Sequence, residues 1–180
     1  MGSNWYAVAA TVALGALAVC HIVYAFILTA QNRSARGANR YEVPAKPEKV
    51  EWASQNMLVL GIIVLLGLAL HLFNFWYNMM FAELVGMRTV LEPTDGFGLI
   101  RATFQTKVYV ILYVIWIVAL WYHLSHGFWS AMQTIGINGK VWFNRWKVIG
   151  TVYVTLLMLA FLVVVLAFAF GCAPSLHCAA

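Results

Sequence analysis

The chain has 180 residues and a formal net charge of +5, is 63% hydrophobic, and contains only 9% Asp, Glu, Lys and Arg. Charged residues make up about 25% of an average soluble domain. A water-soluble fold of this length could not bury so much apolar surface, so the composition excludes a soluble globular domain. It also removes the usual reason to link a basic charge with nucleic acid, and we expect an integral membrane protein.

Four stretches lack charged residues for long enough to cross a hydrocarbon core, which takes about 20 helical residues. They run roughly from Trp5 to Ala30, Trp52 to Ala82, Val108 to Gly136, and Val148 to Gly171. Their continuous apolar character, without alternation of period two, favours helices over the strands of a membrane barrel. We predict an all-α membrane protein, a single four-transmembrane-helix bundle over residues 1–180 with spans at about 5–30, 55–80, 108–135 and 148–171.

The first span contains His21 beside Cys20. It lacks the basic region of a signal peptide and is longer than a typical signal-peptide core, so we expect it to remain as a span. A side chain that can ionise is costly at membrane depth, which makes His21 a functional candidate. Ala18 and Ala25 lie three and four residues from it, on the same helix face, and would let a flat group approach the backbone.

The second span contains His71, which has Gly67 on its face and lies six residues before Tyr77. This position predicts a site near the outer end of the helix. The small neighbour again leaves room beside the imidazole.

The third span contains His123 and His126. The face of His123 carries Ala119 and Gly127, which leave space for a wide ligand. The face of His126 is more crowded, with Tyr122, Trp129 and Ser130. We therefore expect His123 rather than His126 to be a ligand.

The fourth span contains no histidine and leads into a tail with Cys172, His177 and Cys178. An oxidising exterior would permit a disulfide between the two tail cysteines, and free thiols are the alternative.

The placement of the basic residues predicts the topology. Membrane proteins carry an excess of Lys and Arg in their cytoplasmic connections. The connections after the first and third spans hold eight such residues: Arg33, Arg36, Arg40, Lys46, Lys49, Lys140, Arg145 and Lys147. The opposite side holds three, Arg88, Arg101 and Lys107. We therefore expect both termini of this chain to face outward.

Histidine pairs on facing helices can clamp one haem iron. His21 and His123 both lie in the inner half of their spans or near the middle, so they form one candidate pair. His71 would serve a second, outer haem and has no partner in this chain. Ordinary close helix packing, with each histidine hydrogen-bonded to a neighbouring helix, is the alternative.

Three segments carry a family resemblance: YHLSHGFWSAMQTIG at residues 122–136, HIVYAFILTAQNRSAR at 21–36, and SQNMLVLGIIVLLGLALHLFNFW at 54–76. The first resembles the HLxHGfxSafQTlG segment of the dihaem, b558-type cytochrome b membrane-anchor subunit of succinate dehydrogenase and fumarate reductase. The second resembles the segment in which that family's chain first leaves the membrane on the cytoplasmic side, and the third resembles the span that follows. The resemblance extends over nearly the whole chain.

The resemblance implies that His21 and His123 ligate the proximal haem b on the cytoplasmic side and that His71 ligates the distal one. It implies a flavoprotein subunit and an iron–sulfur subunit as partners. It also implies a quinone as the electron carrier, and for this type of subunit menaquinone is favoured over other quinones. It also implies a bacterial inner membrane. The subunit would pass electrons and have no substrate chemistry of its own.

One departure from the family is large. The family has five helices, and its additional N-terminal span supplies a further haem-ligating histidine, whereas this chain begins just before the family's second helix. We expect a truncated sequence, and a separate polypeptide carrying that helix is the alternative. The chain alone would then hold one complete bis-histidine site.

A quinone needs hydrogen-bond partners for its ring oxygens. His126, Ser130 and Gln133 follow each other at spacings of four and three, which predicts a polar stripe near the inner end of the third span. These residues are candidate quinone contacts, and Arg33 is a candidate for a haem propionate. Helix packing is the alternative for the stripe. A rival function for the whole chain is a transporter or proton channel with a histidine relay, and a haem-free structural anchor is a third.

Overall fold

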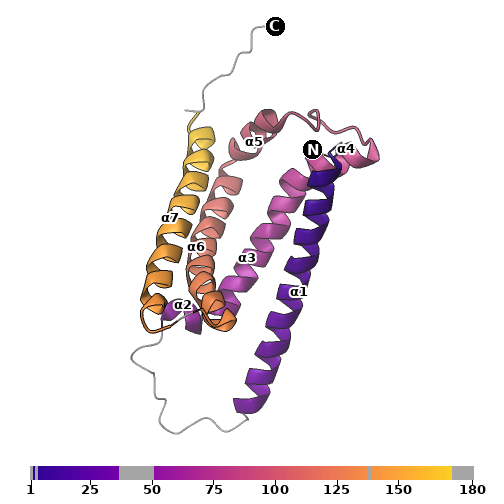
Figure 1. The fold of residues 1–180 in the computed structure, drawn as a ribbon. Helices are drawn as coiled ribbons and strands as arrows, with labels where there is room; N and C mark the ends of the chain where they lie inside the picture. The colour runs from indigo at the N-terminus through magenta and orange to yellow at the C-terminus, as the bar shows by residue number, and fades with distance from the viewer. Residues whose placement is uncertain (1, 3, 37–50, 138, 172–180) are drawn as a thin grey trace.

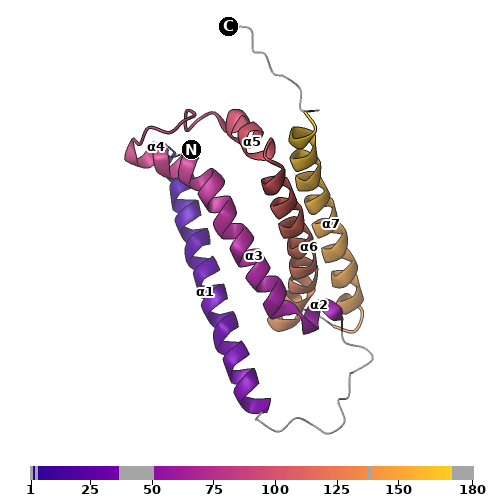
Figure 2. The ribbon, with the colours of Figure 1, turned by 180° about the vertical axis from the view of Figure 1, so that it is seen from behind.

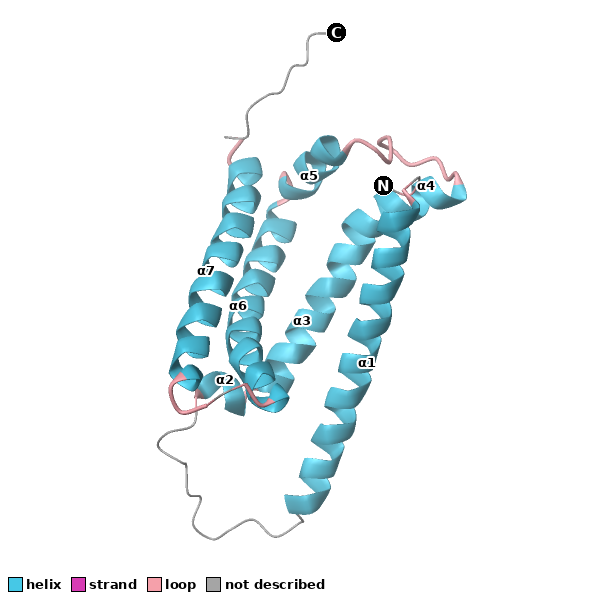
Figure 3. Ribbon diagram, in the orientation of Figure 1, coloured by secondary structure: helices cyan, strands magenta, loops and turns pink. Residues whose placement is uncertain are grey.

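The computed structural model describes residues 2, 4–36, 51–137 and 139–171. Within this part of the chain the regular structure is helical (Figures 1 and 3). Four helices there are long and apolar enough to cross a membrane: residues Trp5–Ala35, Met57–Val85, Lys107–Ile135 and Trp142–Ala169. The prediction of an all-α, four-helix membrane bundle is confirmed.

The elements follow in the order α1 (Trp5–Arg36), α2 (Trp52–Gln55), α3 (Met57–His71), the π-helix η1 (Leu72–Phe81), α4 (Ala82–Val85), α5 (Gly96–Phe104), α6 (Lys107–Ile135) and α7 (Trp142–Ala169). Glycines end two of them. Gly86 and Gly136 adopt left-handed backbone angles, with φ of 64° and 85°. At Gly136 the next amide, of Ile137, donates to the Met132 carbonyl at 3.2 Å, which satisfies a carbonyl of the last turn.

The predicted spans differ from the helices mainly at their ends. The first helix continues past Ala30 to Arg36, and the fourth begins at Trp142, six residues before Val148. Charges stop an apolar run but do not stop a helix, because Lys and Arg are good helix formers that reach the interface at its ends. The short helix α5 has no counterpart in the prediction. It lies at the end of the bundle where α1 begins, which we call the outer end after the predicted topology, and we call the opposite end the inner end. The first turn of α5 is capped by the Asp95 carboxylate, which accepts from the Gly98 amide at 2.8 Å.

The core of the bundle lies between α6 and α7, with α5 closing its outer end. Its buried residues are Phe104, Tyr113, Ile117, Val154, Met158 and Val165. A β-carbon at Gly150 of α7 would overlap the ring of Phe128, so this glycine allows the two helices to approach closely. The Trp121 indole donates to the Thr155 hydroxyl at 2.8 Å and ties the same pair together.

Helix α3 packs on the other side of α6. The Trp116 indole lies over Gly67 and donates to the Val64 carbonyl at 3.0 Å. Beyond His71 the helix widens into η1, whose Asn74 side-chain amide lies 3.4 Å from the Tyr113 hydroxyl in a buried contact. This contact gives both polar side chains a partner at membrane depth, where an unpaired group is costly.

Helix α1 stands apart from the other three. Its most apolar 18-residue stretch contains no buried residue. At the outer end the Gly2 amide donates to the Glu83 carboxylate at 2.6 Å, and α1 starts beside η1 and α4. From there α1 and α3 diverge toward the inner end, as the two opposite views in Figures 1 and 2 show. The wedge between them is where the histidines of α1 and α6 meet.

Candidate functional site

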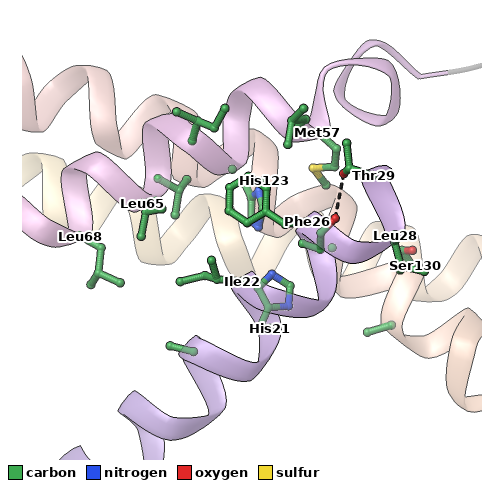
Figure 4. Close-up of a pocket in the computed structure, with 18 of the residues that line it drawn as sticks. His21, Ile22, Phe26, Leu28, Thr29, Met57, Leu65, Leu68, His123 and Ser130 are labelled. Carbon is green, nitrogen blue, oxygen red and sulfur yellow. Dashed lines mark hydrogen bonds between the residues drawn. The ribbon is translucent and has the colours of Figure 1, made fainter. Parts of the chain in front are cut away.

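A cavity of about 570 Å³ lies between α1, α3 and α6. Most of its lining is apolar, as Figure 4 shows with Ile22, Leu65 and Leu68 around the two imidazoles. His21 comes from α1 and His123 from α6. The volume of the cavity lies within the range of about 300–1,000 Å³ typical of small-molecule and cofactor sites. We call it the His21–His123 cavity.

The two imidazoles of this cavity have their ring centres 6.2 Å apart, with the ring planes at 84°. A metal–imidazole bond is about 2.0 Å long and the ring centre lies about 1.2 Å behind the nitrogen, so two imidazoles on opposite sides of one metal have centres about 6.4 Å apart. The observed separation therefore suits one metal ion between the rings. The His123 Nδ1 atom is buried and has no hydrogen-bond partner among the described residues.

Small residues surround the pair. Ala18 and Ala25, predicted to lie on the face of His21, both line the cavity. A β-carbon added at Gly127 would meet no atom within 4 Å, and one added at Gly61 would meet His123 Cε1 at 3.7 Å. The walls therefore stay back from the imidazoles, and a flat macrocycle has room on the α6 side.

His71 lies in a different environment. It lies 14 residues from each end of the helical segment Met57–Val85, and so at the middle of that segment. From the sequence we expect it near the outer end, but the helix continues eight residues beyond Tyr77. Its ring packs against those of Phe75, Tyr113 and Trp116, with centres 5.1, 6.2 and 5.4 Å away.

The space that Gly67 leaves beside His71 is filled by the Trp116 indole, whereas the sequence predicted an open face there. His71 Nδ1 is nevertheless buried without a hydrogen-bond partner in the described part of the chain. The three aromatic rings crowd His71, and no second histidine lies beside it in the described part of the chain.

The predicted polar stripe of α6 is divided between two places. Ser130 lines the His21–His123 cavity, His126 lines a second cavity, and Gln133 is exposed. Arg33 is exposed near the inner end of α1, four residues beyond Thr29 of the first cavity, which puts both on one face. Arg33 therefore lies outside the lining of the first cavity, on the helix face of Thr29, and the three stripe residues are not assembled into one site.

The second cavity, of about 320 Å³, lies at the inner end of the bundle between α2, α6 and α7. Glu51 accepts a hydrogen bond from Lys147 Nζ at 2.6 Å, and its other oxygen lies 3.4 Å from His126 Nδ1. The Lys147 ammonium holds the pKa of the Glu51 carboxyl below its ordinary value, with smaller contributions from His126. Ser125 and four aromatic side chains complete the wall. We call it the Glu51–Lys147 cavity.

Sequence reasoning missed this second cavity. Glu51 and Lys147 are 96 positions apart and carry no motif. The one available signal was that both charges flank apolar spans at what we predicted to be the same side of the membrane. The tail residues Cys172, His177 and Cys178 and the loop residues Arg40, Lys46 and Lys49 lie outside the described residues, and Cys20 is an exposed free cysteine.

Comparisons of this chain with protein-family models, with curated proteins and with solved structures give no match. Among the described residues no group of three or more His, Cys, Asp or Glu side chains is placed to hold a metal ion. The two-histidine arrangement is therefore the candidate site on which a function has to be argued.

Proposed function

We propose that this chain is the cytochrome b membrane-anchor subunit of a succinate:quinone oxidoreductase, either a succinate dehydrogenase or a fumarate reductase. The observation that carries the proposal is the pair of imidazoles, His21 and His123, 6.2 Å apart across an apolar cavity. Two imidazoles on opposite sides of one iron, with four remaining positions for a porphyrin, are the ligand set of a low-spin b-type haem. The sequence resemblance of residues 122–136 to that family supports the same assignment.

Haem b would supply one-electron redox chemistry to this chain. His21 and His123 would hold its iron. Ala18, Ala25 and Gly127 would keep the walls back from the macrocycle, and the mostly apolar lining would lower the local dielectric around it. Arg33, four residues beyond Thr29 on α1, would be the candidate partner of a propionate.

The proposed partners follow from the resemblance. A flavoprotein subunit and an iron–sulfur subunit would dock on the inner side, and a quinone, most simply menaquinone, would exchange electrons in the membrane. The exposed Lys140 and Arg145, at the inner end of α7, would then face the bacterial cytoplasm, with both termini of the chain outside. Tricarboxylic acid cycle succinate oxidation and fumarate respiration are the two processes that such a subunit serves.

A proton-conducting or transporting protein is the second candidate. The observation that favours it is the polar group at mid-membrane outside the first cavity: the unpartnered His71 Nδ1 atom and the buried contact of Asn74 with Tyr113. Such groups line proton paths in other membrane proteins. In that case the purified chain would bind no haem and would conduct protons in vesicles.

The deciding experiment is a reduced-minus-oxidised spectrum of the purified chain. We expect a sharp b-type α band after dithionite, with at most one haem per chain, because His71 has no histidine partner here. His21→Ala and His123→Ala should each remove the band. The matched controls Cys20→Ala and Leu124→Ala change exposed neighbours of the two histidines and should keep it. A folded, colourless wild-type chain would refute the proposal.

A further inference from the structure

We propose that the inner end of α7 carries a binding site for the headgroup of an anionic phospholipid, formed by Lys140, Trp142 and Arg145. We call these three residues the Lys140–Arg145 patch. The patch lies outside the lining of both cavities and has no part in the proposed cytochrome function. It is found where the chain turns from α6 into α7, at the lower end of both helices in Figure 1.

The length of α7 places the patch at the level of the lipid headgroups. The helix has 28 residues, and at 1.5 Å per residue it is about 42 Å long. The hydrocarbon core of a bilayer is only about 30 Å thick, and each headgroup layer adds about 5–7 Å. The stretch from Val148 to Ala169 carries no charged residue and is about 33 Å long, so it fills the core. Arg145 precedes that stretch by three residues, or about 4.5 Å, and therefore lies in the headgroup layer.

The two cations of the patch have no carboxylate partner among the described residues. Their neighbour Lys147 differs, because Glu51 Oε1 lies 2.6 Å from its Nζ atom and offsets its charge. The side chains of Lys140 and Arg145 are exposed, so a phosphate oxygen can approach either one without displacing a carboxylate. Guanidinium and ammonium groups are the usual side-chain partners of phosphate. The charges of the patch therefore favour an anion.

Trp142 holds the guanidinium group of the patch. The Arg145 Cζ atom lies 5.2 Å from the centre of the Trp142 ring, in a cation–π contact. The Trp142 ring centre lies 5.5 Å from that of Trp146, whose indole nitrogen donates to the Ile137 carbonyl at 2.8 Å. These contacts hold Arg145 against the turn, so less conformational entropy is lost when its guanidinium binds a phosphate.

Apolar side chains beside the charges favour a lipid over a soluble anion. Trp142 is 48% exposed, and Ile137, Val141 and Val148 are exposed as well. Tryptophan is enriched at the membrane interface, because it combines a large apolar ring with a polar N–H group. A phospholipid can place its phosphate on the cations and its glycerol and first acyl carbons on these apolar side chains. Free phosphate would use the charges alone.

The test is a titration of the purified full chain in detergent with phosphatidylglycerol, followed by native mass spectrometry. Phosphatidylcholine with the same acyl chains is the zwitterionic control, and glycerol 3-phosphate represents the phosphate without acyl chains. We expect one tightly retained phosphatidylglycerol per chain, bound about fivefold or more tightly than phosphatidylcholine. An excess of glycerol 3-phosphate should not displace it.

Arg145→Gln and Arg101→Gln form a matched pair. Each removes one exposed arginine, so the two variants have the same net charge, but the arginines lie at opposite ends of the bundle. We expect Arg145→Gln and Lys140→Gln each to weaken phosphatidylglycerol binding about fivefold. Arg101→Gln should change it less than twofold. All three side chains are exposed, so the variants should unfold at the same temperature as the wild type.

Equal losses of affinity in Arg145→Gln and Arg101→Gln would indicate a general attraction between charges and would overturn the inference. Equal affinity for the two phospholipids, or displacement by glycerol 3-phosphate, would overturn it as well. Loss of the bound lipid on assembly with the soluble subunits proposed above would assign the patch to a protein interface, against the inference. The measurement does not involve haem. A colourless chain that retains phosphatidylglycerol at the patch therefore supports this site and refutes the cytochrome proposal alone.

Discussion

Replacing Gly127 by leucine should weaken the proposed haem binding while leaving the fold intact. Gly127 lies one turn from His123 on the cavity wall, and a β-carbon there meets no atom within 4 Å. In the protein without cofactor the leucine side chain therefore has free space, and it also raises the helix propensity by about 0.5–1 kcal/mol. In the proposed haem-bound protein the macrocycle would occupy that same space, so the steric cost would fall only on the loaded state.

Overpacking a filled site by several carbons costs about 1–3 kcal/mol, which corresponds to about 5- to 150-fold weaker binding. The assay is titration of the purified Gly127→Leu chain with haemin, followed by the amplitude of the α band after dithionite. Thermal unfolding of the haem-free chain, followed by circular dichroism, provides the control for folding. Haem binding equal to that of the wild type would refute the assignment of the cofactor to this cavity. Unfolding of the haem-free variant would refute our account of the free space.

Three further predictions concern stability. Gly67→Ala places a methyl group inside the ring of Trp116 and should lower the free energy of unfolding by about 1–3 kcal/mol. Gly127→Leu, at a glycine with free space around it, should not destabilise the haem-free chain. An unchanged melting temperature of Gly67→Ala would contradict this prediction. Trp121→Phe removes the indole hydrogen bond to α7 and should cost about 0.5–1.5 kcal/mol in detergent-unfolding titrations, so a neutral result would show that this contact adds nothing. Glu51→Gln should cost up to about 1 kcal/mol at neutral pH, because it removes the exposed ion pair with Lys147. The pKa of Glu51 is lowered in the folded chain, so this difference should be present above pH 4.5 and disappear as the pH falls through the lowered pKa; a difference that grows in acid would contradict the pairing.

The sequence predicted the helices because their signal is local. An uncharged, continuously apolar stretch of about 20 residues forms a helix in lipid, because a helix satisfies all of its own backbone hydrogen bonds. Each of the four candidate stretches is a long helix in the structure. The end residues were less predictable. The first turns of α7 contain Arg145 and Lys147, so the apolar run that marked the span begins later than the helix does. Lys147 Nζ lies 4.4 Å from the centre of the Trp129 ring of α6, a contact between helices that the sequence of α7 alone does not reveal.

The approach of His21 to His123 could be anticipated because each imidazole has small residues on its own helix face. The division of the α6 stripe could not. His126 and Ser130 differ by about 40° around the helix axis, since four residues turn the chain by about 400°. On a helix with one neighbour that difference leaves both on one face. α6 packs between α3 and α7, so the same difference directs the two side chains into separate cavities.

The widening gap below the Gly2–Glu83 contact has a consequence for assembly. Helix α1 is fastened at one end and has no buried residue along its apolar stretch, so its own side chains contribute little to holding it against the bundle. In the proposed haem-bound protein the cofactor held by His21 and His123 would link α1 to α6 where the packing of α1 contributes little. Cofactor insertion and the final docking of α1 would then be one event. Cells starved of haem should accumulate this chain with α1 undocked and open to proteolysis.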